Sequence, residues 1–332
     1  MSLDISAKTI EPKRLAYSHI ARRIGEGKPA SRYQEATFDM QPTTNFHYRS
    51  LWDKEHDLYD KNRTSIVMED WYSFVDPRQF YYGTYTQARA KQQDNMDNSF
   101  KFVDKRGLAT SLPEDTKDLI RKYLSPLRHT EWGANMNNCA ITDEGYGVAI
   151  TQVTMFNAID RLGIAQYLTR MALLIDENDS AGLDTAKKAW LEDEIWQGLR
   201  KAVEDSFVLE DWFETMVAQN IVMDGFVYPL LFKHLVDDIA SHSGPAVAMM
   251  TEFQNDWYAE TIRWTNALIK VTASESEDNA KLLSTWIQNW MGIVDNAMKP
   301  IAESAFAGSG LDKLEMVKQE LLSRITKLGI EV

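Results

Sequence analysis

The stretch TQVTMFNAIDRLGIAQYLTRMALLI, residues 151–175, is the strongest indicator of architecture in this chain. Its apolar side chains recur at intervals of three and four residues, as on a helix, and they fall on nearly all sides of it. They are Val153, Phe156, Ile159, Leu162, Ala165, Leu168, Ala172 and Ile175. A helix with this pattern is surrounded by other helices, so the stretch predicts the central, buried helix of a bundle.

The segments around this stretch predict further long helices, and none shows the alternation of a β-strand. Helical spacing is expected over residues 82–106, 111–140, 183–203, 208–240, 246–271, 274–306 and 311–328. Pro126 should kink the second of these segments. The sequence therefore predicts an all-α fold in which residues 79–332 form one long-helix bundle.

Long-helix bundles of this kind can hold a carboxylate-bridged di-iron site, which needs a Glu-x-x-His pair on two helices. None of the six histidines follows a glutamate by three residues. The nearest approach is 53-DKEH-56, which lies outside the helical part. We therefore expect no catalytic residue and no metal site in this chain, and a role in shaping and stabilising a complex.

Composition narrows the function further. The net charge of −13 argues against binding to nucleic acid and to anionic membrane surfaces. Cys139 is the only cysteine, which excludes an intrachain disulfide and a cysteine-ligated cluster. Residues 1–14 have no apolar signal core, and no apolar run approaches a membrane span. The sequence predicts a soluble, cytoplasmic protein.

Residues 1–78 lack a sustained period and are expected to form an extended N-terminal arm. Aromatic residues crowd its second half and the start of the bundle: Tyr33, Phe38, Phe46, Tyr48, Trp52, Tyr59, Trp71, Tyr72, Phe74, Phe80, Tyr81 and Tyr82. So many rings cannot stay in water, so the segment must cover an apolar surface. That surface is either the chain's own bundle or a partner chain.

Two groups of polar residues within the predicted helices need hydrogen-bond partners. His129 and Glu131 follow Pro126 and are expected to form a hydrogen-bonded structural pair. Asn135, Asn137 and Asn138 lie on a helix that should be buried. Their amides either bond to backbone freed by the kink or meet a partner chain.

Several segments in order give the chain a family resemblance. They are 31-SRYQEAT-37, 45-NFHYR-49, 68-MEDWY-72, 76-DPRQ-79, 127-LRH-129, 133-GANMNN-138, 160-DRLGIAQYL-168 and 217-VAQN-220. Over essentially its whole length the chain resembles the β subunit of the hydroxylase component of bacterial multicomponent monooxygenases. Among these systems the resemblance is greatest to multicomponent phenol hydroxylase.

This resemblance implies a ferritin-like bundle and a place in an (αβγ)₂ hydroxylase that hydroxylates phenol or related aromatics with O₂. The di-iron centre would lie in the α subunit. Electrons would come from NADH through a separate reductase that carries FAD and an iron–sulfur cluster, and a small regulatory protein would act on the system. Two alternatives stay open: an independent di-iron ferritin-like oxidase, and a helical scaffold unrelated to oxygenases.

The resemblance also assigns positions. The α-subunit pattern Asp-Glu-x-Arg-His resembles 158-AIDRL-162 and 260-ETIRW-264, and another ligand segment resembles 223-MDGFVY-228. The positions of lost metal ligands would then be Ile159, Leu162, Met223, Thr261 and Trp264. We expect hydrocarbon to fill the interior where the iron would be. The arm is expected to contact the iron-bearing subunit through Tyr33, Phe46, Trp52, Trp71, Tyr72, Phe80 and Tyr81.

Overall fold

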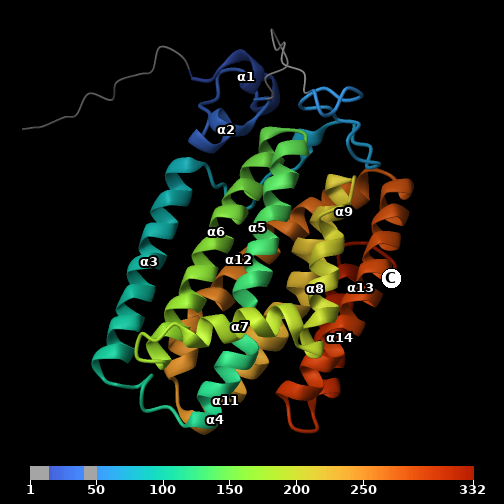
Figure 1. Cartoon of the computed structure of the whole chain (residues 1–332). Helices are drawn as coiled ribbons and strands as arrows, with labels where there is room; N and C mark the ends of the chain where they lie inside the picture. The colour runs from blue at the N-terminus through green and yellow to red at the C-terminus, as the bar shows by residue number, and fades with distance from the viewer. Residues whose placement is uncertain (1–14, 41–50) are drawn as a thin grey trace, which may run out of the picture.

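The computed structural model describes residues 15–40 and 51–332 of the chain. Within these ranges the regular elements are all helices, and the long ones run side by side along the height of the molecule (Figure 1). The predicted all-α bundle is therefore confirmed. Among the described residues, no helix combines the length and the hydrophobicity needed to cross a lipid bilayer.

From Tyr82 onward the helices follow one another along the chain with short connections. The long helices are α3 (Tyr82–Lys105), α5 (Leu127–Glu144), α6 (Val148–Ile175), α12 (Ala246–Glu275), α13 (Glu277–Ala305) and α14 (Gly310–Thr326). Shorter ones are α1 (Ser18–Ile24), α2 (Arg32–Thr37), the 3₁₀ turn η1 (Trp71–Ser73), α4 (Glu114–Leu119), the π-helix η2 (Ile120–Leu124), α7 (Ala181–Glu192) and α8 (Glu194–Ser206). One further continuous helix comprises α9 (Trp212–Met216), η3 (Val217–Met223), α10 (Asp224–Val227), η4 (Tyr228–Leu235) and α11 (Val236–Ser243).

Pro126 and Pro229 affect their helices differently. Pro126 separates η2 from α5, because proline has no N–H to continue the hydrogen-bond ladder of a helix. Pro229 does not interrupt its helix, because it lies at the start of η4, a π-helical stretch. A π-helix pairs residues five apart and widens the turn, so it accommodates the missing donor. A second π-helical stretch, η3, precedes it in the same helix.

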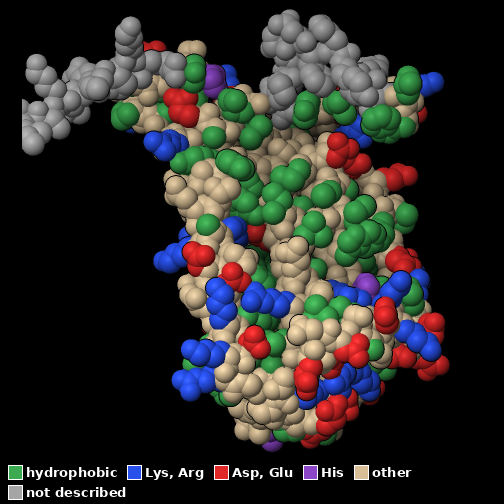
Figure 2. Space-filling view, turned by 60° about the vertical axis from the view of Figure 1, so that its left-hand side comes forward, with side chains coloured by type: hydrophobic (Ala, Val, Ile, Leu, Met, Phe, Trp, Pro, Cys, Tyr) green, Lys and Arg blue, Asp and Glu red, His purple; other side chains and the backbone are tan. Residues whose placement is uncertain are grey.

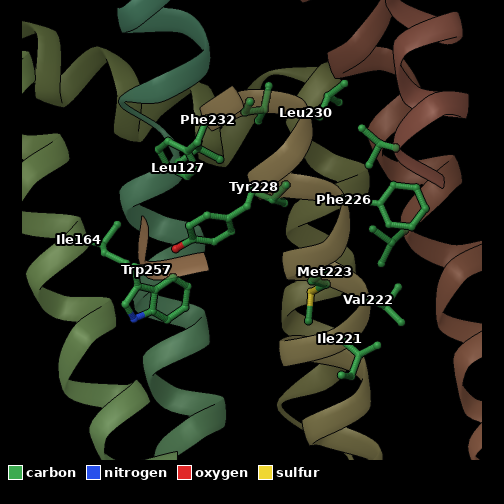
Figure 3. Packing of buried hydrophobic residues seen from close by; sticks show 14 of the residues in the cluster. Leu127, Ile164, Ile221, Val222, Met223, Phe226, Tyr228, Leu230, Phe232 and Trp257 are labelled. Carbon is green, nitrogen blue, oxygen red and sulfur yellow. The ribbon is translucent and has the colours of Figure 1, made fainter. Parts of the chain in front are cut away.

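The core of the bundle is built from large side chains contributed by most of its helices. Trp196, Trp212, Trp257 and Trp264 are fully buried. Figure 3 shows one region of this core, where the Tyr228 ring points away from its own helix toward Trp257, Ile164 and Leu127. The Tyr228 and Trp257 ring centroids are 5.2 Å apart.

Helix α6 is not buried on every side, and in this respect the prediction for residues 151–175 is wrong. Ile159 is 51% exposed and Leu162 is 45% exposed, and Met155 on the same face is also exposed. The opposite face of α6 packs into the core through side chains such as Val153, Ile164 and Leu168. When apolar residues lie on nearly all sides of a helix, no polar face marks the side that meets solvent. The sequence therefore could not distinguish the two faces of α6.

The described part of the arm divides into two packing regions. Ile20 and Tyr33 from α1 and α2 form a small cluster with Phe38, and Tyr81 packs against it. The main core of the bundle instead includes Ile66, Met68, Trp71, Tyr72 and Phe74. The division of the chain into an arm and a bundle at residue 78 stays a prediction.

Helix α13 buries a pair of tryptophans, Trp286 and Trp290, as expected from their four-residue spacing. The Trp290 indole also donates to Glu214 Oε1 at 3.0 Å. We expect Trp290→Ala to lower the free energy of unfolding by about 3–5 kcal/mol, because it leaves a large cavity in the core. Urea unfolding followed by circular dichroism measures the change. Trp52→Ala, at a residue that is 78% exposed, is the control, with an expected change below about 0.5 kcal/mol. Equal unfolding curves for the two variants would contradict the prediction.

Candidate functional site

A buried arginine lies between two carboxylates in the middle of the bundle. Arg161, on the inner face of α6, is 1% exposed. Its Nη1 donates to Glu131 Oε2 on α5 at 3.2 Å, and its Nη2 donates to the carboxylate of Asp224 on α10. Its guanidinium carbon lies 4.4 Å from the ring centroid of Trp257 on α12. Four segments of the bundle therefore converge on one guanidinium group.

Each carboxylate is also held by a second partner. The Tyr228 hydroxyl donates to Glu131 Oε1 at 2.9 Å. The Gln219 amide donates to Asp224 Oδ1 at 3.0 Å. Buried polar groups need such partners, because an unpaired one carries the full cost of desolvation. These contacts fix the carboxylates in place without help from the arginine.

Side-chain amides extend this network across α5, α6 and η3. The Asn157 amide donates to Asn220 Oδ1 at 2.9 Å and to Asn138 Oδ1 at 3.1 Å. Asn220 donates to the same Asn138 oxygen at 3.0 Å, and Asn137 donates to Gln219 Oε1 at 2.9 Å. Gln219 and Asn220 both come from η3. The π-helical stretch thus contributes two adjacent amides to the interior, in line with the frequent use of such stretches at special sites.

A second charged cluster adjoins the first and shares Trp257 with it. Asp160 accepts from Arg89 of α3 at 2.6 Å and from the Trp257 indole nitrogen at 2.9 Å. Arg89 also bonds to Glu260 of α12 at 2.8 Å, and Arg78 reaches the same carboxylate at 2.9 Å. This cluster ties α3 to α6 and α12.

Burial controls the protonation of the central group. It raises the pKa of Glu131 to about 7, although Arg161 opposes the shift. It also raises the pKa of Asp224, again against the effect of Arg161. Burial alone would lower the pKa of Arg161, but Asp224 and Glu131 hold it above its ordinary value. Arg161 therefore stays positively charged, whereas burial favours protonation of the two carboxylates and the arginine opposes it.

The pKa of Glu131 predicts a pH dependence of stability. Its folded-state pKa of about 7 lies above the unfolded value of about 4.3, so the folded protein binds the proton more tightly. The resulting stabilisation is fully present below about pH 4.3 and is lost as the pH rises through 7. We expect the free energy of unfolding to fall by up to about 1.4 kcal/mol per pH unit across this window. Glu131→Gln, which keeps an acceptor for Tyr228, should remove this slope in urea unfolding. An identical slope in both proteins would contradict the assignment.

The structure corrects the predicted interior. Ile159 and Leu162 point out of the bundle, so their assignment as former ligand positions in its interior is wrong. Met223, Thr261 and Trp264 are buried, and their assignment stays a prediction. Hydrocarbon does not fill the middle of the bundle, because the charged and amide network lies there. The inner face of α6 carries Asn157, Asp160 and Arg161 instead.

The sequence carries signals for this network, but the partners of its charged residues differ from those expected. Glu131 bonds to Arg161 and Tyr228, and the expected pair with His129 is wrong. The His129 ring instead stacks on Trp190, with centroids 6.0 Å apart. Asp160 and Arg161 interrupt an otherwise apolar helix, and charges in such a setting require buried partners. These two charged residues in an apolar helix are the sequence feature that indicates the buried network.

Three of the arm residues expected to contact a partner are buried in this chain instead. Trp71 is 6% exposed and lies 5.5 Å from Trp212, ring to ring. The Tyr72 hydroxyl accepts from the Val148 N–H at 3.2 Å, and the Tyr33 hydroxyl accepts from the Asp76 N–H at 2.9 Å. The predicted partner contacts of Trp71, Tyr72 and Tyr33 are therefore wrong, because rings this buried cannot fill another chain's pocket.

The other four arm residues keep their prediction. Trp52 is exposed, whereas Phe80 and Tyr81 are half-buried. Phe80 packs under the Arg78 guanidinium, 4.7 Å from carbon to ring centroid. Phe46 lies outside the described residues.

An exposed apolar surface covers the outer faces of α5 and α6. We call it the α5/α6 face, and it consists of Trp132, Met136, Met155, Ile159 and Leu162. The two helices are packed together, and the Asn135 amide of α5 donates to the Ala158 carbonyl of α6 at 2.8 Å. Figure 2 shows hydrophobic side chains gathered in the upper half of the visible surface and charged side chains crowding its lower half. Five large apolar side chains exposed on two neighbouring helices are typical of a protein–protein interface.

Comparison with known proteins gives a consistent family. The model of the Methane/Phenol/Alkene Hydroxylase family matches residues 52–276. The chain is 44% identical, over 331 residues, to phenol 2-monooxygenase oxygenase component DmpL of Pseudomonas sp. (strain CF600), covering 100% of this chain and 99% of that protein. It is 24% identical to the beta subunit of the toluene-4-monooxygenase hydroxylase component of Ectopseudomonas mendocina, covering 75% of each chain.

A solved structure extends this similarity to the fold. A chain of the xenon-pressurized phenol hydroxylase from Pseudomonas sp. OX1 superposes with a TM-score of 0.94 and 47% identity, covering 99% of both chains. The relatives are hydroxylase components of multicomponent monooxygenases, as the resemblance of the sequence predicted. This chain belongs to the methane/phenol/alkene hydroxylase family.

Proposed function

We propose that this chain is the non-catalytic β subunit of a multicomponent phenol hydroxylase. In the proposed (αβγ)₂ assembly, the α subunit carries the di-iron centre and hydroxylates phenol or a related aromatic with O₂. A separate reductase with FAD and an iron–sulfur cluster supplies electrons from NADH, and a small regulatory protein acts on the complex. Two relatives support this placement: the oxygenase component of a phenol 2-monooxygenase, and the beta subunit of the hydroxylase component of a toluene-4-monooxygenase.

The buried Arg161 is the observation that carries the non-catalytic role. A di-iron bundle directs carboxylates and two histidines from four helices at its metal ions. Here Glu131 and Asp224 face the interior, but a guanidinium group bridges them. In the part of the chain that the structure describes, no three His, Cys, Asp or Glu side chains are grouped to hold a metal ion. These residues do not fit a di-iron centre, and we assign no step of hydroxylation to them.

The α5/α6 face supports the assembly role. We propose that the iron-bearing subunit covers Trp132, Met136, Met155, Ile159 and Leu162, since burial of these side chains is favourable only against another apolar surface. The exposed Trp52 is a second proposed contact, from the arm formed by residues 1–78. Aromatic side chains in such positions commonly dominate the energy of an interface.

Metal analysis of the separated subunits tests the proposal. We expect this chain, purified alone, to hold no stoichiometric iron, because the Arg161 guanidinium already lies between the two interior carboxylates. Co-expressed with its partner subunits, it should co-purify with a longer chain that contains the iron. Inductively coupled plasma mass spectrometry on each chain gives the result. Two tightly held iron ions in this chain alone would favour an independent di-iron oxidase instead. Purification without any iron-containing partner would favour a scaffold outside the hydroxylase complex.

A further inference from the structure

The interior of the bundle is organised around a cation that the chain itself supplies. The Arg161 guanidinium contacts Glu131 and Asp224 through its two Nη atoms, and its Nη2 also reaches Asn220 Oδ1 at 3.3 Å. The Trp257 ring lies across its face at 4.4 Å. The surroundings thus match a planar cation: acceptors bond to both Nη1 and Nη2, and an aromatic ring lies against the guanidinium, although the buried Nε has no hydrogen-bond partner among the described residues.

We propose that Glu131, Asp224, Asn220 and Trp257 form a cation-binding site whose ligand is the chain's own Arg161 side chain, and that removal of this side chain leaves a site for a free guanidinium ion. The proposal deepens the non-catalytic role, because it explains what occupies the interior in place of a metal. The test measures the thermal stability of this chain and not hydroxylation activity. Failure of either idea is therefore visible separately.

The walls of the site are held independently of the arginine. Tyr228 fixes Glu131 with a hydrogen bond of 2.9 Å, and Gln219 fixes Asp224 with one of 3.0 Å. Asn220 is tied to both Asn138 and Asn157. A site whose acceptors are already in position loses little entropy when a ligand binds. Truncation of Arg161 should therefore leave a cavity lined with unmatched acceptors that a small cation can enter.

The chemistry of the walls selects the kind of cation. Two carboxylates with amide oxygens and an indole ring suit a flat, singly charged, weakly hydrated organic ion. Zinc, copper and iron sites in proteins usually include imidazole or thiolate ligands, and the described residues of this site include neither. Magnesium and manganese favour octahedral oxygen ligands, which an indole ring against one face cannot provide. Guanidinium is the free form of the group that already fits there.

Thermal unfolding of the full chain with Arg161→Ala tests the proposal. We expect its melting temperature to be well below that of the wild type and to rise with the logarithm of guanidinium chloride concentration, as for a specific ligand. Up to about 50 mM, the general denaturing effect of guanidinium is small. The wild type, whose site is filled, should show only that slight decrease. Equal concentrations of sodium chloride, magnesium chloride and manganese chloride should not raise the melting temperature of the variant.

Arg324→Ala is the matched control. Arg324 is a largely enclosed arginine, but its donors bond to the neutral Asn266 at 2.6 Å and Thr265 at 2.7 Å. Asp224 acts on Arg324 only through space, and these two hydrogen-bond acceptors are neutral, so guanidinium should not raise the melting temperature of this variant. A decrease of the same size in Arg161→Ala, Arg324→Ala and the wild type would overturn the proposal. Preferential stabilisation of Arg161→Ala by a divalent metal would also overturn it.

A second variant covers the case in which Arg161→Ala does not fold. Combining Arg161→Met with Glu131→Gln and Asp224→Asn removes the two carboxylate charges together with the arginine. Replacing a whole buried ion group is tolerated far better than removing one member. We expect this triple variant to fold and to be insensitive to added guanidinium. A triple variant that is as unfolded as the single one would show that charge compensation is not the role of Arg161, and would overturn the proposal.

Discussion

Replacement of Ile159 and Leu162 together by glutamate should abolish assembly of this chain with the iron-bearing subunit and leave its own fold intact. Both side chains are about half exposed on α6, and glutamate is a good helix former, so the chain itself should lose less than about 0.5 kcal/mol per position. In the complex each carboxylate would be buried against an apolar partner surface at a cost of several kcal/mol. The affinity should therefore fall by more than about 1000-fold.

Sedimentation velocity of the variant mixed with its partner subunits measures this loss. Met316→Glu, at an exposed methionine on α14, is the matched control and should assemble normally. Circular dichroism confirms that both variants remain helical. Full assembly by the double variant would show that the α5/α6 face is not the contact. The search for the interface would then return to Trp52 and the arm.

Asp224→Ala should destabilise the chain by about 3–5 kcal/mol, because it leaves the buried Arg161 without its closest carboxylate. The desolvation cost of the arginine is then only partly offset by Glu131. The Gln219 amide also loses its acceptor, which adds a second unpaired buried group. This is a much larger effect than removal of a surface charge.

Chemical denaturation of the purified chain measures this effect. Asp237→Ala is the control, since Asp237 on α11 forms an exposed pair with Lys233 on η4 at 3.1 Å. Its loss should change the stability by less than about 1 kcal/mol. Asp224→Asn, which keeps an acceptor for Gln219, should fall between these two variants. Equal stability of Asp224→Ala and the wild type would show that the buried charges are not coupled.

The arm shows where composition alone could mislead. Its aromatic residues correctly indicated that the segment covers an apolar surface, but composition could not say whose surface it was. Trp71 and Tyr72 cover this chain's own core, whereas Trp52 stays exposed. Trp71 packs on Trp212 and Phe213, which lie far away in the sequence. No local pattern in the arm could identify those neighbours.

The sequence by itself determined the all-α bundle and the inward position of Trp290, because helical periodicity is local and repeats within a few residues. It also indicated the family, through the resemblance of ordered segments such as residues 160–168. Only the tertiary structure decided which face of α6 is buried, since an almost uniformly apolar helix does not mark its outer side. It alone also brought Arg161 to Glu131 and Asp224, which lie 30 and 63 positions away in the chain. Such pairs form where helices cross, and the crossing depends on the packing of the whole core and not on the residues beside each charge.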